Sequence, residues 1–351
     1  MRACVAFILW ALTFTCLAAQ TPSPKPQPVF QETLHATLPR GLPPYKPTAQ
    51  LNGSLKSVGG DTMATLTKYW IELFTKTHPG VHVDMEAKGP ETGAPALTAG
   101  TAQLAQIPRK MLSQELADFV KKYGYEPFAV RVAGGSYRTP KMTHAICFFV
   151  HKDNPISKLT FAQLDAIFST TRKRGYKEPI NTWGQLGLKG EWADPKIKLW
   201  GFTQPNGVAN FVQERVLDNG KYREGIRDRI TGKGLATMDT IVQGVAADRY
   251  AIGYGGFTNA TPDVKVIALA EKDSGPYFKG TFEEVVSHSY PLSRFVYIYV
   301  NRPPGQPFDP LVRDFLNMVL SKQGQEAVVR EGIFLPLPTS ILKQERARLL
   351  K

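Results

Sequence analysis

The chain has 351 residues and a net charge of +13 at pH 7, with 42% hydrophobic and 21% charged residues. This length exceeds what one compact domain usually needs, so we expect two lobes, each with a hydrophobic core. The positive charge favours anionic partners, which include small oxyanions, acidic surfaces and nucleic acid. No basic patch interleaved with aromatic residues occurs in the sequence, which argues against nucleic acid.

The N-terminus has the pattern of a secretory signal peptide. Arg2 precedes an apolar run over residues 5–17 that continues into small residues as far as Ala19. We expect residues 1–19 to be removed by cleavage near Ala19, and the mature protein to be periplasmic or secreted. The run is shorter than the roughly 20 residues of a membrane-spanning helix, so no stable membrane insertion is expected. Cys16 is not preceded by small residues, which favours free export over lipidation.

Proline is frequent in residues 20–47, directly after the signal peptide. Such a composition is typical of an extended leader rather than of a packed element. The folded body is therefore expected to begin at about Thr48.

Predicted strands and helices alternate along the rest of the chain. Strands are expected at residues 55–58, 81–85, 145–150, 197–202, 251–257 and 295–300. A helix is expected after Asp61 and Thr62, and further helices at residues 94–100, 161–168, 208–217, 238–246 and 310–330. This alternation predicts an α/β fold.

The sequence lacks the common motifs of enzymes and metal sites. Its six histidines never have the spacing of metal ligands, and it contains no nucleophile elbow, Walker loop or dinucleotide fingerprint. Cys147 is the only cysteine outside the signal segment, and it lies in an apolar run, so we expect a buried, unpaired thiol. We expect no metal, no cofactor and no catalytic activity.

Three loops combine small and hydrogen-bonding residues with a following helix. They are Gly60-Asp61-Thr62, Gly89-Pro90-Glu91-Thr92-Gly93 and Gln204-Pro205-Asn206-Gly207. A helix N-terminus presents free amides and a partial positive charge, so these loops are candidate oxyanion sites. Each loop taken alone is better explained as an ordinary helix cap, and only the occurrence of three in one chain favours an oxyanion site.

A series of motifs follows in order between residues 52 and 340. It includes Gly60-Asp61-Thr62-Met63, His151-Lys152-Asp153-Asn154-Pro155, Thr182-Trp183-Gly184, Ile252-Gly253-Tyr254, Tyr290-Pro291-Leu292-Ser293-Arg294 and Leu335-Pro336-Leu337-Pro338. This series resembles the phosphate-binding periplasmic proteins of phosphate ABC transporters, the PstS-like members of the type II periplasmic binding protein family.

The resemblance implies a two-lobed fold in which each lobe is a mixed sheet flanked by helices. Lobe I would consist of residues 48–143 and 258–351, and lobe II of residues 144–257. Phosphate or a related oxyanion would be held between the lobes of a monomer and delivered to an ABC transporter permease, without a catalytic step. The residues at matching positions would be ligand contacts: Gly60, Asp61, Thr62, Thr92, Gly93, Arg109, Asn206 and Gly207.

The chain departs from the family pattern at several of these loops. Pro90 and Glu91 replace small or hydroxyl residues, Pro108 replaces a serine before Arg109, and Phe202 and Val208 replace an arginine and a threonine. A hydrogen bond to a charged group contributes about 1.5–3 kcal/mol, so these losses predict weaker phosphate binding. An ionised Glu91 pointing into the site would repel an anion by about 4 kcal/mol per unit of ligand charge at 4 Å.

Two other functions remain open from the sequence. The departures favour a degenerate or respecified PstS-like paralogue that acts as a sensor or binds another solute. A phosphatase would require a metal cluster or an activated nucleophile, and the sequence shows neither.

Overall fold

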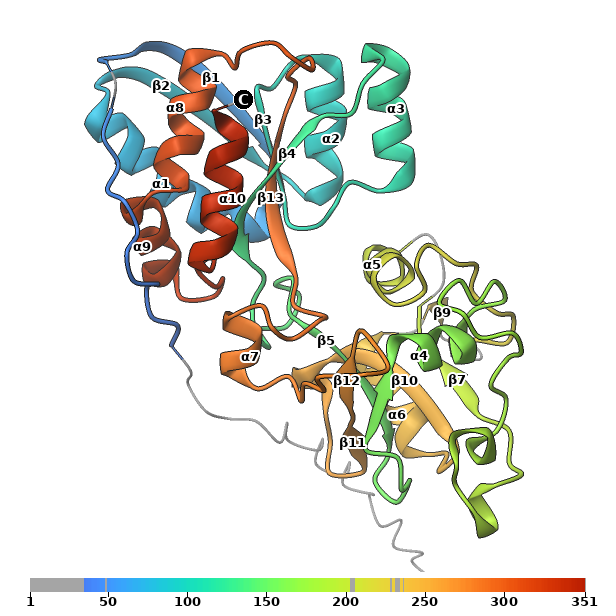
Figure 1. Cartoon of the computed structure of the whole chain (residues 1–351). Helices are drawn as coiled ribbons and strands as arrows, with labels where there is room; N and C mark the ends of the chain where they lie inside the picture. Colours follow the sequence, from blue (N-terminus) through green and yellow to red (C-terminus); the bar gives the residue numbers. More distant parts are fainter. Residues whose placement is uncertain are drawn as a thin grey trace, which may run out of the picture.

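The computed structural model describes residues 35–350 except 48, 203–205, 228, 231–233 and 236. The expected signal peptide and the first part of the expected leader lie outside the described residues, as do Gln204 and Pro205. Figure 1 shows two lobes, an upper one built from the first and last parts of the chain and a lower one built from its middle.

Lobe I contains a five-stranded sheet in the order β2-β1-β3-β13-β4. Its strands are β1 (Asn52–Gly59), β2 (Gly80–Ala87), β3 (Leu104–Ile107), β4 (Phe128–Gly134) and β13 (Phe295–Val300). β1 is parallel to both β2 and β3, whereas β13 is antiparallel to β3 and β4. The helices of this lobe are η1 (Asp61–Met63), α1 (Ala64–Thr77), α2 (Pro90–Ala99), α3 (Ser113–Tyr123), α8 (Pro310–Val319), α9 (Lys322–Glu331) and α10 (Thr339–Leu349).

Lobe II contains a four-stranded sheet in the order β11-β5-β10-β7. Its strands are β5 (Ile146–His151), β7 (Lys198–Trp200), β10 (Ala251–Gly256) and β11 (Val264–Val266). Two further sheets have two strands each: β6 (Lys158–Thr160) pairs with β12 (Ala268–Ala270), and β8 (Arg229–Ile230) pairs with β9 (Gly234–Leu235). The helices are α4 (Phe161–Phe168), α5 (Gly207–Arg215), α6 (Met238–Ala246), η2 (Trp183–Leu186), η3 (Gly190–Trp192) and η4 (Phe257–Asn259). The predicted α/β class with mixed sheets is confirmed.

Two chain segments connect the lobes. One runs from β4 to β5, and the other runs from β12 through α7 (Phe282–Val286) to β13 (Figure 1). β11 pairs with β5, and β12 pairs with β6, so the chain leaves lobe II after residue 270. This return lies later than residue 258, the boundary expected from the sequence.

Each lobe has its own hydrophobic core. In lobe I, Trp70 and Phe74 of α1 are completely buried against the sheet. In lobe II, the rings of Phe148 and Phe168 pack around Tyr254 at centroid distances of 5.5 and 6.0 Å from it. Cys147 is buried and unpaired, as predicted, and burial raises the pKa of its thiol well above the ordinary value.

The segment over residues 35–47 lies extended along lobe I. Leu42 is buried, the Lys322 amide donates to the Pro43 carbonyl (2.9 Å), and the Tyr45 amide donates to Oε1 of Gln323 (2.7 Å). This part of the leader is extended, as expected, but it is also packed against the body of the protein. None of the helices within the described residues combines the length and hydrophobicity needed to cross a membrane.

Candidate anion site between the lobes

The helix starts of lobe I meet at one edge of its sheet. β1, β2 and β3 are parallel neighbours, so the loops after their carboxyl ends lie side by side. The Gly60 amide donates to the Gln106 carbonyl (2.8 Å). The amides of Lys88 and Gly89 donate to the Gly59 carbonyl (3.0 and 3.1 Å). We call these joined loops the cradle; it holds Gly60, Asp61, Thr62, Thr92 and Gly93.

Close packing explains two glycines of the cradle. A β-carbon on Gly60 would lie 2.6 Å from Cδ of Pro108. One on Gly93 would lie 2.9 Å from the carbonyl oxygen of Val58 and 3.3 Å from Cα of Gly59. Larger residues at either position would separate the loops, so glycine is needed to hold the helix starts together.

Thr62 contributes an unsatisfied hydroxyl to the cradle. Its Oγ1 is buried and has no hydrogen-bond partner within the described part of the chain. The neighbouring Asp61 is exposed, and its Oδ1 accepts a hydrogen bond from the Thr62 amide (3.0 Å). A buried hydroxyl without a partner costs about 1–3 kcal/mol, so the Thr62 hydroxyl has unused hydrogen-bonding capacity.

Side chains from the first turn of α2 occupy the start of this helix. Thr92 Oγ1 donates to the Gly89 carbonyl (2.8 Å) and is therefore engaged locally. The Glu91 carboxylate folds back over Gly89, where a β-carbon would lie 2.3 Å from Glu91 Oε1. Glu91 thus places a negative charge at the helix N-terminus, which is the position that would attract an anion. Pro90 has no amide N–H and offers no donor.

Arg109 lies where the two lobes touch. A β-carbon on Gly207 of lobe II would lie 3.2 Å from Cδ of Arg109. The Arg109 guanidinium donates to both carboxylate oxygens of Glu115 (2.7 and 2.8 Å), and the side chains of this pair are 13% and 14% exposed. Glu115 also accepts from the Leu112 amide (2.7 Å). The structure therefore holds Arg109 mainly by a half-buried carboxylate rather than leaving it free.

Asn206 caps the helix that lobe II directs at this contact. Its Oδ1 accepts hydrogen bonds from the amides of Val208 (2.8 Å) and Ala209 (3.1 Å), in the first turn of α5. Two of the donors that could have bound an anion are thereby satisfied within the helix. Gly207 has no side chain, and this is what allows the start of α5 to approach Arg109.

The replaced positions have structural partners of their own. The Pro108 carbonyl accepts a hydrogen bond from Thr143 Oγ1 (2.7 Å), which links the cradle to the β4–β5 connection. The Phe202 amide donates to the Tyr254 hydroxyl (3.0 Å), and that hydroxyl donates to the Phe202 carbonyl (2.7 Å). Phe202 and Val208 are both half-buried.

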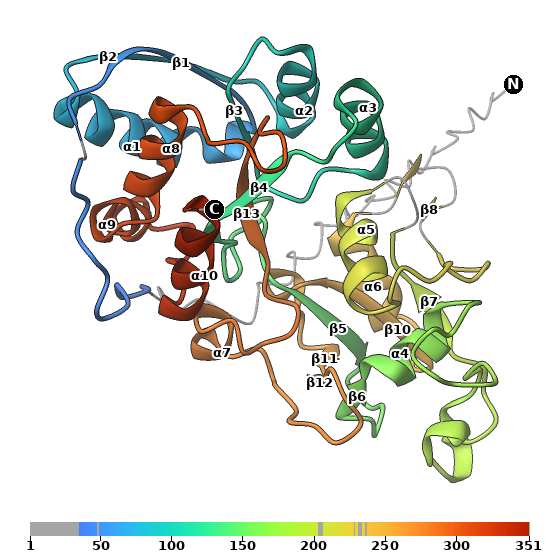
Figure 2. The ribbon, with the colours of Figure 1, turned by 45° about the horizontal axis from the view of Figure 1, so that its top comes forward.

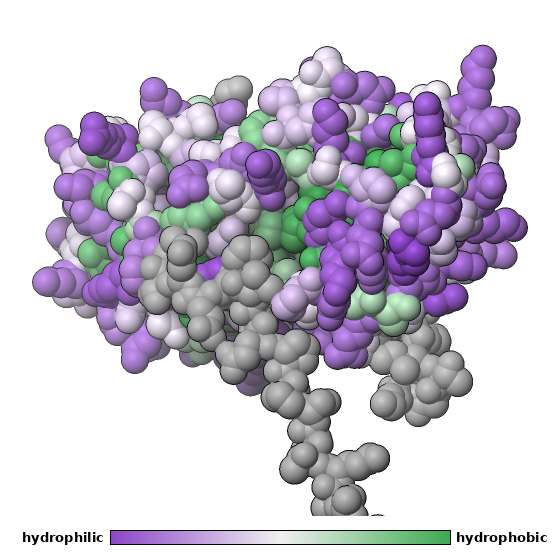
Figure 3. All heavy atoms as spheres, turned by 90° about the horizontal axis from the view of Figure 1, so that it is seen from below, coloured by the Kyte–Doolittle hydropathy of each residue, from purple (hydrophilic) through white to green (hydrophobic). Residues whose placement is uncertain are grey.

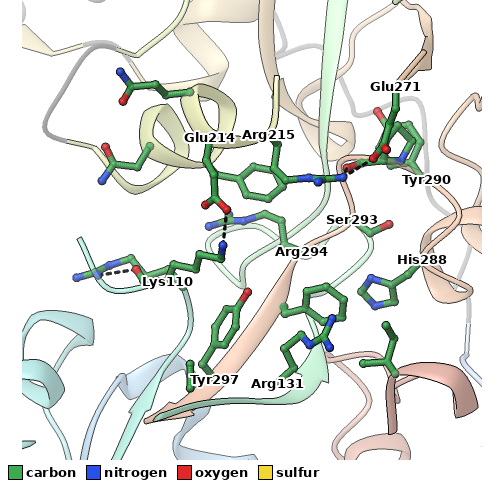
Figure 4. A pocket seen from close by; sticks show the side chains of 18 of the residues that line it. Lys110, Arg131, Glu214, Arg215, Glu271, His288, Tyr290, Ser293, Arg294 and Tyr297 are labelled. Atoms are coloured by element: carbon green, nitrogen blue, oxygen red, sulfur yellow. Dashed lines mark hydrogen bonds and ion pairs between the residues drawn. The ribbon is translucent and has the colours of Figure 1, made fainter. Parts of the chain in front are cut away.

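A cavity of about 1260 Å³ opens beside the Arg109–Gly207 contact. Figures 1 and 2 both place α5 on the side of lobe II that faces lobe I, and Figure 4 shows the cavity between α5 and β13. Arg109 and Gly207 are the two predicted contacts that line it; the other six do not. Its remaining walls include Phe211 of α5, Tyr297 of β13 and Arg294.

Most cations on the cavity wall are paired with carboxylates. Lys110 pairs with Glu214 and Arg215 with Glu271, as the dashed lines in Figure 4 show. Arg131 and Arg348 both contact the completely buried carboxylate of Glu345 (2.5 and 2.6 Å).

Arg294 was not predicted as a site residue, although its motif contributed to the resemblance. Its guanidinium has no hydrogen bond and no ion pair with any residue that the structure describes, and it lies 5.3 Å from the centre of the Phe211 ring. Burial lowers the pKa of Arg294 to about 10, and the charge of Arg109 acts in the same direction. The motif at residues 290–294 could have drawn attention to Arg294, but the sequence alone does not show which side chains surround its guanidinium.

Comparisons with known proteins place this geometry in context. The family model described as a PBP superfamily domain matches residues 45–323. The phosphate-binding protein PstS of Pseudomonas aeruginosa is 40% identical over 309 residues, which cover 88% of this chain and 91% of that protein. The PstS of Staphylococcus saprophyticus is 26% identical over 85% of this chain and 84% of that protein.

Solved structures with low sequence identity share the fold. The crystal structure of PstS from Borrelia burgdorferi has a TM-score of 0.52 at 17% identity and covers 82% of this chain and 100% of that one. The crystal structure of an ABC-type phosphate transport receptor from Vibrio cholerae has a TM-score of 0.50 at 18% identity, over 80% and 99% of the two chains.

Proposed function

This chain belongs to the family of PstS phosphate-binding proteins within the PBP superfamily, and from that premise we propose that it is an extracytoplasmic receptor for phosphate or a related oxyanion. The anion would bind between the two lobes of a monomer, which would then deliver it to the permease of an ABC transporter. The protein would act by binding and release, without a catalytic step.

The observation that carries this proposal is the unsatisfied hydroxyl of Thr62. It lies buried in the cradle, at the edge where the loops after β1, β2 and β3 meet. We propose that this hydroxyl bonds the anion, together with Gly60, Asp61, Thr92 and Gly93 from lobe I, Arg109 at the contact, and Asn206 and Gly207 from lobe II. A protonated oxyanion could donate to Asp61 while accepting from Thr62.

The side chains of Glu91 and Asn206 limit how an anion can bind at the starts of α2 and α5. The Glu91 carboxylate lies over Gly89, and Asn206 caps the first turn of α5. An anion must either displace Glu91 from Gly89 to reach the start of α2, or bind at Thr62 and Arg109 without using the starts of α2 and α5. We therefore propose that phosphate binds more weakly here than at an open pair of helix N-termini.

The test compares Thr62→Val with wild type by equilibrium dialysis against radiolabelled phosphate. Valine keeps the volume of threonine but removes the hydroxyl, so we expect phosphate affinity to fall about tenfold or more. Thr65→Val is the matched control, because Thr65 is exposed in the first turn of α1. Equal phosphate binding by Thr62→Val and Thr65→Val would place the anion elsewhere.

A second candidate function is a receptor for a different solute. Phe202 and Val208 favour it, since they place apolar side chains where the family resemblance implies an arginine and a threonine. The capping of α5 by Asn206 also favours it, because this cap removes amide donors from the anion.

A further inference from the structure

The cavity beside the Arg109–Gly207 contact is a separate compartment from the cradle. Gly60, Thr62 and Thr92 are not among its lining residues, and it extends instead toward α10 and the segment before β13. Its volume of about 1260 Å³ is larger than the roughly 300–1,000 Å³ of most pockets for small organic molecules, so such a molecule would fit within it. A tetrahedral oxyanion is close in size to a few water molecules and would fill only a small part of it.

Two cations on the cavity wall have no carboxylate partner among the described residues, the exposed Lys272 and the half-buried Arg294, and only Arg294 is withdrawn from water. Arg109, Lys110, Arg131, Arg215 and Arg348 each have a carboxylate partner. Arg294 has none within the described residues, and it is partly removed from water. An arginine stays charged in proteins, so a desolvated guanidinium without an acceptor favours an incoming anion. The carboxylates of Glu214 and Glu271 do not oppose this, because each is neutralised by its own ion pair.

Aromatic and hydroxyl groups surround Arg294. The Phe211 ring of α5 lies under its guanidinium, and the Tyr297 side chain of β13 is 8% exposed. The Tyr297 hydroxyl has no hydrogen-bond partner among the residues that the structure describes. Figure 4 shows Tyr297 pointing its hydroxyl toward the space in which Arg294 extends below α5. The cavity therefore offers a cation and a hydroxyl next to an aromatic surface, which suits a ligand with an anionic group and an apolar part.

We propose that this cavity binds a small organic anion, whose negative group contacts Arg294 and the Tyr297 hydroxyl and whose apolar part lies against Phe211 and Phe295. Because this site does not use Thr62 or the helix starts of the cradle, it goes beyond the proposed phosphate function. Arg109 and Gly207, which are also proposed for the phosphate site, line this cavity, so the two sites would adjoin at this contact.

Phenylphosphonate is a suitable probe, since it joins a doubly charged head to an aromatic ring and is not hydrolysed. We would titrate the mature, ligand-stripped protein with phenylphosphonate in a calorimeter, using wild type, Arg294→Gln and Arg313→Gln. Arg313 is exposed on α8 and is the matched control for loss of one positive charge. Arg294→Gln should bind about 10- to 100-fold more weakly than wild type, whereas Arg313→Gln should match wild type.

Two further variants separate this site from the cradle. Tyr297→Phe removes only a hydroxyl and should weaken phenylphosphonate several-fold without disturbing the fold. Thr62→Val should lose inorganic phosphate but retain phenylphosphonate. Failure of wild type to bind phenylphosphonate, equal binding by Arg294→Gln, or loss of phenylphosphonate in Thr62→Val would each overturn the proposal. Failure of the wild type to bind inorganic phosphate, with phenylphosphonate binding intact, would contradict only the proposed function.

Discussion

Single residues decide how open the cradle is to an anion. Glu91 and Asn206 are short-range features, because the Glu91 carboxylate lies over Gly89 at the start of α2 and Asn206 caps the first turn of α5. The sequence was sufficient to identify these loops, but it did not reveal that Glu91 folds over Gly89 or that the Asn206 side chain bonds two amides of α5. Arg294 shows a different limit: its surroundings include Phe211 and Arg109, which are distant from it in sequence.

The replaced residues of lobe II give a direct test of the second candidate function. Phe202→Arg combined with Val208→Thr adds a cation and a hydroxyl near the start of α5. If the site has lost phosphate affinity through these positions, the double variant should gain about tenfold or more in phosphate affinity, measured by calorimetry. Phe202→Gln with Val208→Ala is the uncharged control. No difference between the two double variants would count against the interpretation.

Elements were predicted best where their periodicity is uninterrupted. The strand over 295–300 has the expected bounds, and the strand over 55–58 lies within β1. The single helix expected over residues 310–330 is wrong, because the chain forms α8 and α9 with a break between them. Ser321 caps α9 by accepting from the Gly324 amide (3.2 Å), while the apolar pattern continues across the break.

The extended segment before β1 is attached to lobe I by a buried polar cluster. The Tyr45 hydroxyl donates to Asp314 Oδ2 (2.5 Å) and lies 2.7 Å from Nε2 of His78, which is itself 3.0 Å from the same carboxylate oxygen. Burial and the bond to Asp314 raise the pKa of Tyr45, so the phenol remains protonated.

Removing this hydroxyl should loosen the segment. Tyr45→Phe leaves the Asp314 carboxylate with one partner fewer, and we expect the free energy of unfolding in urea to fall by about 1–3 kcal/mol. Tyr277→Phe serves as the control, since no described residue bonds the Tyr277 hydroxyl. A Tyr45→Phe protein as stable as Tyr277→Phe would show that the cluster does not hold the segment in place.

At the scale of the whole molecule, the alternation of elements and the family resemblance were sufficient to predict two α/β lobes. The place where the chain returns to lobe I was harder to predict, because β11 and β12 have only three residues each and carry little periodic signal. The predominantly hydrophilic face in Figure 3, with hydrophobic side chains visible mainly near its middle, fits a chain of high net charge.

Histidines at both lobe connections make stability depend on pH. Burial lowers the pKa of His144 and of His288 to about 4, with Arg294 and Arg131 acting in the same direction. The unfolded chain therefore binds more protons than the folded one between about pH 6.5 and pH 4, and stability falls as pH falls through this window. Each histidine should cost about 2 kcal/mol of unfolding free energy between pH 7 and pH 5.

The pH effect can be measured by urea unfolding at these two pH values. His288→Asn should reduce the loss of stability, and asparagine tolerates the φ of 56° at this position. His82→Asn, at an exposed position of β2, should lose as much stability as wild type. The same pH dependence in both variants would contradict the role assigned to His288.

The most direct test of the central claim, that an oxyanion binds between the lobes, is a calorimetric titration of the mature protein with phosphate. The protein would first be stripped of ligand by partial unfolding and refolding, and measured at neutral pH and moderate salt. We predict saturable binding of one phosphate per chain, at micromolar affinity or tighter. No binding heat at millimolar phosphate would contradict the account.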